Sequence, residues 1–252
     1  MEPPKILPVV NPNNSNVKPH HPNLPKVGVG EPGGGSLLLM ISPVRTGKST
    51  IISNLFLNDS MYGQDFFDEI NVISNTIAND VTSRFLRKVA NCEDHYSDAH
   101  IDKIVNRQKT FDKEDQPQIA LVLDDCLGSI KRESKINHLC SRYRHFNIKL
   151  LIISLQKFRG SVSPVIRANA TDVIVGSPFP NQRELQALAE EYGDLFGGSD
   201  RWMRIYKKAT PNRYDFLYMD LQQNPPLAYH NFEKVIAVGG QAEDNKDFEI
   251  NS

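Results

Sequence analysis

The chain has 252 residues, 39% of them hydrophobic and 23% charged, which is typical of a globular protein with one large domain or two small ones. Its formal net charge of −1 excludes a uniformly basic protein, so any contact with DNA must come from a local patch or from several assembled subunits. The three cysteines are an odd and sparse set that suits a reducing compartment, and no apolar stretch is long enough to span a membrane.

Proline, asparagine and glycine dominate residues 1–35, which contain few large apolar side chains. Such a composition buries too little surface to offset the entropy lost on ordering, so we expect a flexible arm. The first residues lack the pattern of a signal peptide. We therefore predict an intracellular protein with a globular domain over residues 36–237 and a polar, acidic tail over residues 238–252.

The first informative stretch reads Ser-Leu-Leu-Leu-Met-Ile over residues 36–41 and Ser-Pro-Val-Arg-Thr-Gly-Lys-Ser-Thr over residues 42–50. A buried strand, a loop and a helix over residues 51–57 follow one another, which is the context of the phosphate-binding P-loop, G-x-x-x-x-G-K-[ST]. We expect this loop to bind the phosphates of a nucleotide. Its residues are Ser42, Pro43, Val44, Arg45, Thr46, Gly47, Lys48, Ser49 and Thr50.

The residue types in this loop suit that chemistry. Gly47 allows the backbone to approach a phosphate, Lys48 would reach the β- and γ-phosphates, and the Ser49 hydroxyl would bind Mg²⁺. The loop departs from the pattern at its first position, where Ser42 replaces glycine, and Pro43 has no N–H to donate. A chance Gly-Lys-Ser sequence in an ordinary loop is the alternative interpretation.

Downstream of the loop, residues 70–74 are predicted to form a second strand. Residues 80–90 have helical spacing of apolar side chains, with Asp80 as a candidate N-cap. Residues 101–117 are polar and favour a helix followed by a loop.

The second informative stretch reads Gln-Ile-Ala-Leu-Val-Leu-Asp-Asp over residues 118–125. An apolar run that ends in two acids predicts a central parallel strand with carboxylates at its carboxyl end, where open α/β sheets bind ligands. This is the form of a Walker B strand. Asp124 would hold Mg²⁺ through water, and Asp125 would orient or deprotonate the attacking water.

Residues 129–146 are predicted to be helical and carry several basic side chains, which form either a solvated face or the source of an arginine that reaches a neighbouring subunit's γ-phosphate. Residues 148–154 form another apolar strand, and Gln156 follows it as a candidate γ-phosphate sensor. A strand over 172–176, a helix over 182–196 and strands over 202–206 and 214–221 complete the predicted elements.

This order of parts resembles the FtsK–HerA superfamily of DNA-pumping ATPases, and more closely the genome-packaging ATPases of nucleocytoplasmic large DNA viruses and virophages. The resemblance covers about residues 36–237. The matching segments are residues 42–50, 119–125, 144–148 with 154–156, 163–169, and 214–220 with Asn231 and Phe232. It implies an α/β P-loop NTPase fold of the RecA/FtsK type, with a mostly parallel central sheet flanked by helices.

The resemblance also implies function. It assigns Lys48 and Ser49 to phosphates and metal, Asp124 to Mg²⁺, Asp125 to catalysis and Gln156 to sensing. Arg144 is the first candidate for an arginine finger, and the others are Arg142 and Arg167. The implied protein forms a ring, a hexamer or a pentamer, that hydrolyses ATP and moves double-stranded DNA into a capsid. Its implied partners are capsid or portal proteins. Its implied location is the cytoplasm of an infected cell, in the virus factory, or the virion.

Other functions fit parts of the pattern. Asp125 stands where the superfamily often has glutamate, and Ser42 stands where it has glycine. A small-molecule kinase also joins a P-loop to a parallel sheet, but no arginine-rich lid segment is evident. A GTPase would show Asn-Lys-x-Asp, which is absent from this sequence. A catalytically weak P-loop scaffold that binds DNA is favoured only by the serine at position 42.

Overall fold

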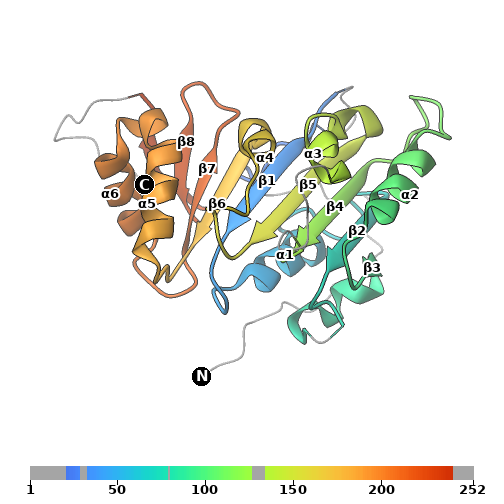
Figure 1. Cartoon of the computed structure of the whole chain (residues 1–252), viewed down its shortest axis with the longest axis horizontal. Coiled ribbons are helices and arrows are strands. Elements are labelled where there is room, and N and C mark those ends of the chain that lie inside the picture. Colours follow the sequence, from blue (N-terminus) through green and yellow to red (C-terminus); the bar gives the residue numbers. More distant parts are fainter. Residues whose placement is uncertain (1–20, 29–32, 79, 127–133, 241–252) are drawn as a thin grey trace.

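A single mixed sheet forms the centre of the molecule. The computed structural model describes residues 21–28, 33–78, 80–126 and 134–240. Its nine-stranded sheet has the order β3-β2-β4-β5-β1-β6-β7-β8-β9 (Figure 1). The strands are β1 (Ser36–Ile41), β2 (Glu69–Ser74), β3 (Asn91–Glu93), β4 (Ile119–Asp124), β5 (Ile148–Leu155), β6 (Asp172–Gly176), β7 (Phe216–Asp220), β8 (Leu227–His230) and β9 (Lys234–Val238).

The direction of the strands places the site. Strands β3, β2, β4, β5, β1 and β6 are parallel, and β7, β8 and β9 extend the sheet in antiparallel fashion. The predicted α/β fold with a mostly parallel sheet is confirmed. Because parallel strands end at the same edge, the loops that follow β1, β4 and β5 meet there.

Both faces of the sheet are covered, which explains why the central strands are continuous apolar runs. In β1, Leu37, Leu39 and Ile41 pack on one face, with α2 to α6. Leu38 and Met40 pack on the other face, with α1. The helices α5 and α6 lie over the end of the sheet formed by β6, β7 and β8 (Figure 1).

The described helices connect these strands. They are α1 (Lys48–Leu57), α2 (Asp98–Gln108), α3 (Lys135–Cys140), α4 (Pro164–Asn169), α5 (Gln182–Tyr192) and α6 (Ser199–Ala209). Short 3₁₀ segments are Thr82–Arg84, Leu86–Lys88, Tyr143–Phe146 and Gly193–Phe196. No helix of the described ranges combines the length and the apolar character needed to cross a bilayer.

Two predicted elements were wrong. The strand predicted over residues 202–206 is the middle of α6, in which Trp202, Ile205, Tyr206 and Ala209 are buried at helical spacing. The 3.6-residue period therefore outweighed the strand preference of the aromatic side chains.

The helix predicted over residues 80–90 is instead two 3₁₀ turns. Its expected apolar face packs only in part, since Leu86 is 1% exposed but Val81 is 71% exposed and Val89 is 38% exposed. The Asp80 carboxylate accepts hydrogen bonds from the Thr82 N–H and the Ser83 hydroxyl, and these local bonds favour a turn.

Other elements end earlier than predicted. The helix predicted over 182–196 is α5 followed by a 3₁₀ turn. Of the helix predicted over 129–146, α3 and a 3₁₀ turn are present, and residues 127–133 lie outside the described residues. The short strands β3, β8 and β9 were not predicted.

Residues 21–28, which belong to the expected flexible arm, pack against the domain. Leu24 and Val27 are buried in the same cluster as α1. The Tyr62 hydroxyl donates to the Pro25 carbonyl, 2.5 Å away, and the Lys149 ammonium donates to the Gly28 carbonyl at 3.0 Å. Residues 1–20 lie outside the described residues, as do residues 241–252 of the expected tail.

Candidate functional site

The loop after β1 has the predicted strand–loop–helix arrangement. The Ser42 N–H donates to the Leu155 carbonyl at 2.9 Å, which ties the start of the loop to the end of β5. Gly47 ends the loop in the left-handed conformation, with φ 95°, and α1 begins at Lys48. The N-terminus of a helix with its unpaired N–H groups attracts anions, so the end of this loop is suited to a phosphate.

Ser42, the departure from the P-loop pattern, has a defined place. Its Oγ makes a hydrogen bond with the Thr46 Oγ1, which also donates to the Pro43 carbonyl at 2.6 Å. A Cβ atom built on Gly176, at the end of β6, would lie 1.9 Å from the Ser42 Oγ. The serine therefore fits because the neighbouring strand ends in glycine.

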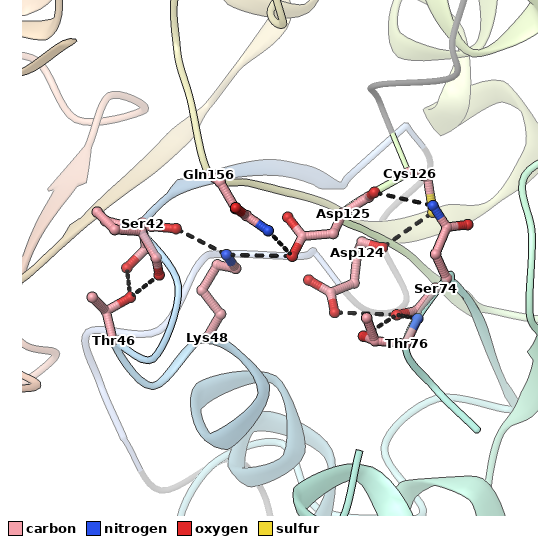
Figure 2. Close-up of polar contacts among 11 residues, drawn as sticks. Ser42, Thr46, Lys48, Ser74, Thr76, Asp124, Asp125, Cys126 and Gln156 are labelled. Atoms are coloured by element: carbon pink, nitrogen blue, oxygen red, sulfur yellow. Dashed lines mark hydrogen bonds and ion pairs between the residues drawn. The ribbon is translucent and has the colours of Figure 1, made fainter. Parts of the chain in front are cut away.

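Three predicted catalytic side chains meet at this edge (Figure 2). The Lys48 Nζ donates to the Ser42 carbonyl at 2.8 Å and lies 3.6 Å from the Asp125 Oδ2. The Gln156 Nε2 donates to the same Asp125 Oδ2 at 2.9 Å. The structure thus joins the loop, the end of β4 and the end of β5 through one carboxylate oxygen.

The backbone of Asp125 is in the left-handed region, with φ 52°. Its N–H donates to the Ser154 carbonyl at 3.0 Å, and its carbonyl accepts from the Asn75 Nδ2 at 3.4 Å. Non-glycine residues in this conformation are uncommon and concentrate at functional sites. The turn after β4 directs the Asp125 carboxylate toward Lys48 (Figure 2).

Asp124 is deeper, with 8% of its surface exposed. Its Oδ2 accepts from the Ser74 Oγ at 3.2 Å, whereas its Oδ1 is buried and has no hydrogen-bond partner among the described residues. Loss of solvent and, to a smaller extent, the neighbouring Asp125 carboxylate raise the pKa of Asp124, against the lowering effect of the nearby Ser154 hydroxyl. A bound cation would give the unpaired oxygen a partner and favour its ionised form.

The donor set suits Mg²⁺. This ion prefers oxygen ligands and keeps several water molecules, so it needs only one or two protein groups beside phosphate oxygens. Ser49 at the start of α1 and Asp124 at the end of β4 are hydroxyl and carboxylate donors of this kind. Within the described ranges, no group of three or more histidine, cysteine, aspartate or glutamate side chains forms a separate metal site.

Asp80 is a residue whose place at the site the sequence did not indicate. Burial raises the pKa of its carboxyl group, but hydrogen bonds from Ser83, Ser49 and Thr82 outweigh burial, and the pKa is lowered. The Ser49 hydroxyl, the predicted metal ligand, therefore has an ionised partner. The only sequence signal was a lone aspartate before a weak helical pattern, and that pattern predicted a helix cap.

The predicted arginine finger does not reach this edge within one chain. The Arg144 Nε donates to the carbonyl of Gly35, the residue before β1, at 3.2 Å, and the Arg144 Cζ lies 5.1 Å from the centroid of the Tyr143 ring. Both contacts are at the amino ends of the strands. The eight residues of β5 span roughly 26 Å, so Arg144 could act on phosphates only in a neighbouring subunit.

The two other arginine candidates are also outside the site. Arg142 is exposed beside the same 3₁₀ turn as Arg144. Arg167 is in α4, where its Nη1 lies 2.8 Å from the Glu191 Oε2 and its Cζ lies 5.7 Å from the centroid of the Phe158 ring. The structure therefore brings together Lys48, Asp125 and Gln156 but none of the three arginines proposed as a finger.

Comparison with known proteins gives the following likenesses. No protein-family model matches the chain. The uncharacterized protein 075L of Invertebrate iridescent virus 6 is 28% identical over 192 residues, which are 74% of this chain and 71% of that protein.

Two solved structures share the arrangement of elements. The genome packaging NTPase B204 from Sulfolobus turreted icosahedral virus 2, in complex with AMP, matches with a TM-score of 0.54 at 16% identity over 78% of this chain and 98% of that one. B204 from Sulfolobus Turreted Icosahedral Virus, described as a DNA-packaging ATPase, matches with a TM-score of 0.52 at 13% identity over 78% and 97%. The chain therefore shares the fold of these viral NTPases.

Proposed function

We propose that this protein is a Mg²⁺-dependent ATPase that moves double-stranded DNA into a viral capsid. The observation that carries the ATPase part is the meeting of Lys48, Asp125 and Gln156 at the carboxyl edge of the sheet, beside the unpaired oxygen of Asp124. Hydrolysis of a nucleoside triphosphate uses a lysine that binds the phosphates and a carboxylate that orients or deprotonates the attacking water. Lys48 and Asp125 are such groups, and the Gln156 amide contacts the Asp125 carboxylate.

The protein's own residues have separable roles. Lys48 would exchange its contact with the Ser42 carbonyl for the β- and γ-phosphates and stabilise the charge that develops there. Asp125 would accept a hydrogen bond from the attacking water and take its proton. Gln156 would hold the Asp125 carboxylate in place through the hydrogen bond from its Nε2. As the proposed sensor, Gln156 would respond to whether a γ-phosphate occupies the site.

Metal chemistry would be supplied beside these groups. Ser49 and Asp124 would hold Mg²⁺, which when bound neutralises phosphate charge. Lys48, Asp125 and Gln156 would not coordinate the metal ion in this proposal. The raised pKa of Asp124 fits a carboxylate whose charge a cation would compensate.

The packaging part of the proposal is supported by the fold shared with the B204 structures and by the resemblance of the ordered motifs. A motor must hold DNA of any sequence, so it contacts the phosphate backbone rather than the bases. With a net charge of −1, one chain offers no general attraction for DNA, and a ring of subunits would create a basic channel from local patches. We propose that such a ring, a hexamer or a pentamer, works with capsid or portal proteins in the infected cell.

The test is ATP hydrolysis by the full chain, with and without long duplex DNA. We expect DNA to stimulate turnover several-fold, and Lys48→Ala and Asp125→Asn each to lower turnover by a factor on the order of 100 to 10,000. Matched controls on the exposed surface are Lys103→Ala and Asp112→Asn, which should hydrolyse ATP as the unmodified protein does. Movement along DNA is then measured by ATP-dependent displacement of a third strand from a triplex.

Each contrary result identifies the part that fails. A rate of ATP hydrolysis that duplex DNA does not change would contradict the proposed DNA-translocating role. Another P-loop enzyme, such as a small-molecule kinase, would then be tested with phosphoryl acceptors. Nucleotide binding without any turnover under conditions that allow assembly would favour the scaffold alternative.

A further inference from the structure

An exposed aromatic ring lies directly beside the phosphate loop. Tyr214, in the turn between α6 and β7, has 52% of its surface exposed. A Cβ atom built on Gly47 would lie 3.7 Å from the Tyr214 Cδ1, so the ring is in van der Waals range of the last residue before α1. None of the roles proposed above uses this side chain.

The turn that carries the ring is strained and firmly held. Tyr214 has φ 75°, which is rare for a bulky side chain and costs about 1–3 kcal/mol. Its N–H donates to the Ser177 carbonyl at 3.3 Å, just beyond β6. Two residues on, the Phe216 N–H donates to the Asn231 Oδ1 at 3.0 Å, just beyond β8. Hydrogen bonds to residues just beyond two other strands therefore hold the backbone of a turn that has an aromatic residue where glycine would fit without strain.

The two sides of β1 offer different chemistry. On the side of β5 and β4 lie Gln156 and Asp125, which define the γ-phosphate end of a bound nucleotide. On the other side β1 pairs with β6, which pairs with β7, the strand that follows Tyr214. A triphosphate with its γ end at Lys48 and Asp125 has its nucleoside end on the side of β6 and β7, where the ring is.

We propose that Tyr214 is the stacking platform for the base of the bound nucleotide. The Arg213 Cζ lies 4.9 Å from the centroid of the Tyr214 ring, so a guanidinium lies within cation–π distance of this ring. Aromatic rings and arginine planes are the groups on which proteins stack nucleobases. This inference rests on the proposed function, because the triphosphate must first occupy the loop.

The experiment measures binding rather than turnover, with ATP and inorganic tripolyphosphate as the two ligands and the full chain as the protein. Tyr214→Ala should weaken ATP binding about tenfold and leave tripolyphosphate binding unchanged, because only ATP has a base to stack. Tyr214→Phe should bind both ligands as the unmodified protein does. The control is Phe111→Ala, since Phe111 is another exposed aromatic residue, 37% exposed, between α2 and β4.

A spectroscopic variant separates stacking from a change in folding. Trp202 is fully buried and gives a constant background, so Tyr214→Trp adds an indole whose emission reports on the loop. We expect ATP to quench this emission and tripolyphosphate to leave it unchanged.

The outcomes distinguish this inference from the proposed function. If the unmodified protein binds neither ligand, the nucleotide site itself is wrong and the platform fails with it. If the unmodified protein binds ATP but Tyr214→Ala binds it equally well, only the platform is overturned. An equal response of the Tyr214→Trp indole to ATP and to tripolyphosphate would also overturn the platform.

Discussion

Ser42 and Gly176 are mutually dependent, since a Cβ atom at position 176 would lie 1.9 Å from the Ser42 Oγ. Ser42 begins the proposed phosphate-binding loop, and Gly176 ends β6, the strand beside β1. A serine at the first position of the loop is therefore compatible with the fold because the adjacent strand has no side chain there. The departure from the P-loop pattern is accommodated without displacing Lys48, which still donates to the Ser42 carbonyl.

The first prediction tests this dependence. Gly176 does not have a positive φ, so Gly176→Ala introduces a steric overlap without backbone strain. We expect this variant to lose about 1–3 kcal/mol of stability, the usual cost of overpacking, and to unfold roughly 2–10 °C lower. Thermal and urea unfolding measure the change.

The double variant Ser42→Gly/Gly176→Ala supplies the control. Removing the Ser42 hydroxymethyl group removes the overlap, so the double variant should recover most of the lost stability, and the coupling between the two positions should exceed about 1 kcal/mol. Additive losses would show that Ser42 and Gly176 do not depend on each other.

The sequence predicted the parts of the site that lie within single segments. One apolar run ends in Asp124 and Asp125, and another is followed by Gln156. Both runs are parallel strands that bring polar groups to the same edge of the sheet, and each can be recognised from its own local sequence. The pairing of Ser42 with Gly176 and the approach of Tyr214 to Gly47 were not predictable. They join positions far apart in the chain, and only the strand order brings them together.

For the fold, too, some elements were predictable from the local sequence and others were not. The central parallel strands were recognised because burial on both faces requires continuous apolar residues. In α6, Trp202 and Tyr206 suggested a strand, yet the apolar residues of this element recur with the helical period and face the core. The strands β8 and β9 are short and half-exposed in places, so neither an apolar run nor strict alternation revealed them.

The second prediction concerns the Gln156 amide, which contacts the proposed catalytic carboxylate of Asp125. Gln156→Ala removes the donor that lies 2.9 Å from the Asp125 Oδ2. A hydrogen bond to a charged group is worth about 1.5–3 kcal/mol, so we expect kcat to fall roughly 10- to 150-fold while ATP affinity changes little. Steady-state kinetics and equilibrium binding of ATP separate the two effects. Gln186→Ala, an exposed glutamine of α5, is the matched control, and an unchanged kcat in Gln156→Ala would exclude the role.

The third prediction concerns Arg144, which lies at the edge of the sheet opposite the proposed phosphate-binding loop of its own chain. If it is the arginine finger, it must act on a neighbouring subunit. Arg144→Ala should then lower turnover by a factor on the order of 1,000 and leave ATP binding intact. Mixing Arg144→Ala with Lys48→Ala subunits should restore part of the activity, because some interfaces then combine an intact Lys48 with an intact arginine.

A comparison with Arg159 tests the alternative. Arg159 follows Gln156 closely, is exposed, and lies 4.0 Å from Glu190 in a weak ion pair. Full activity of Arg144→Ala together with a strong loss in Arg159→Ala would move the finger to the carboxyl edge of the sheet. Loss of thermal stability in Arg144→Ala without loss of kcat would assign Arg144 to its contacts with Gly35 and Tyr143 alone.

The fourth prediction concerns a buried carboxylate far from the loop. Asp172, at the start of β6, is fully buried and accepts hydrogen bonds from the Tyr218 hydroxyl at 2.6 Å and the Thr171 hydroxyl at 2.7 Å. Burial raises the pKa of Asp172 to about 6, above the ordinary value of 3.8. The folded state therefore holds the proton more tightly than the unfolded state, and this contribution to stability is complete below about pH 4 and lost as the pH rises through 6.

The variant Asp172→Asn cannot ionise at this position and serves as the reference for the unmodified protein. Relative to Asp172→Asn, the unmodified protein should lose stability between pH 4 and pH 7, by at most about 3 kcal/mol, because each pKa unit corresponds to about 1.4 kcal/mol. Other titrating groups are common to both proteins and cancel in the difference. Urea unfolding at several pH values measures this difference, and a difference that stays constant from pH 4 to pH 7 would mean that Asp172 has the same pKa in the folded and unfolded chains.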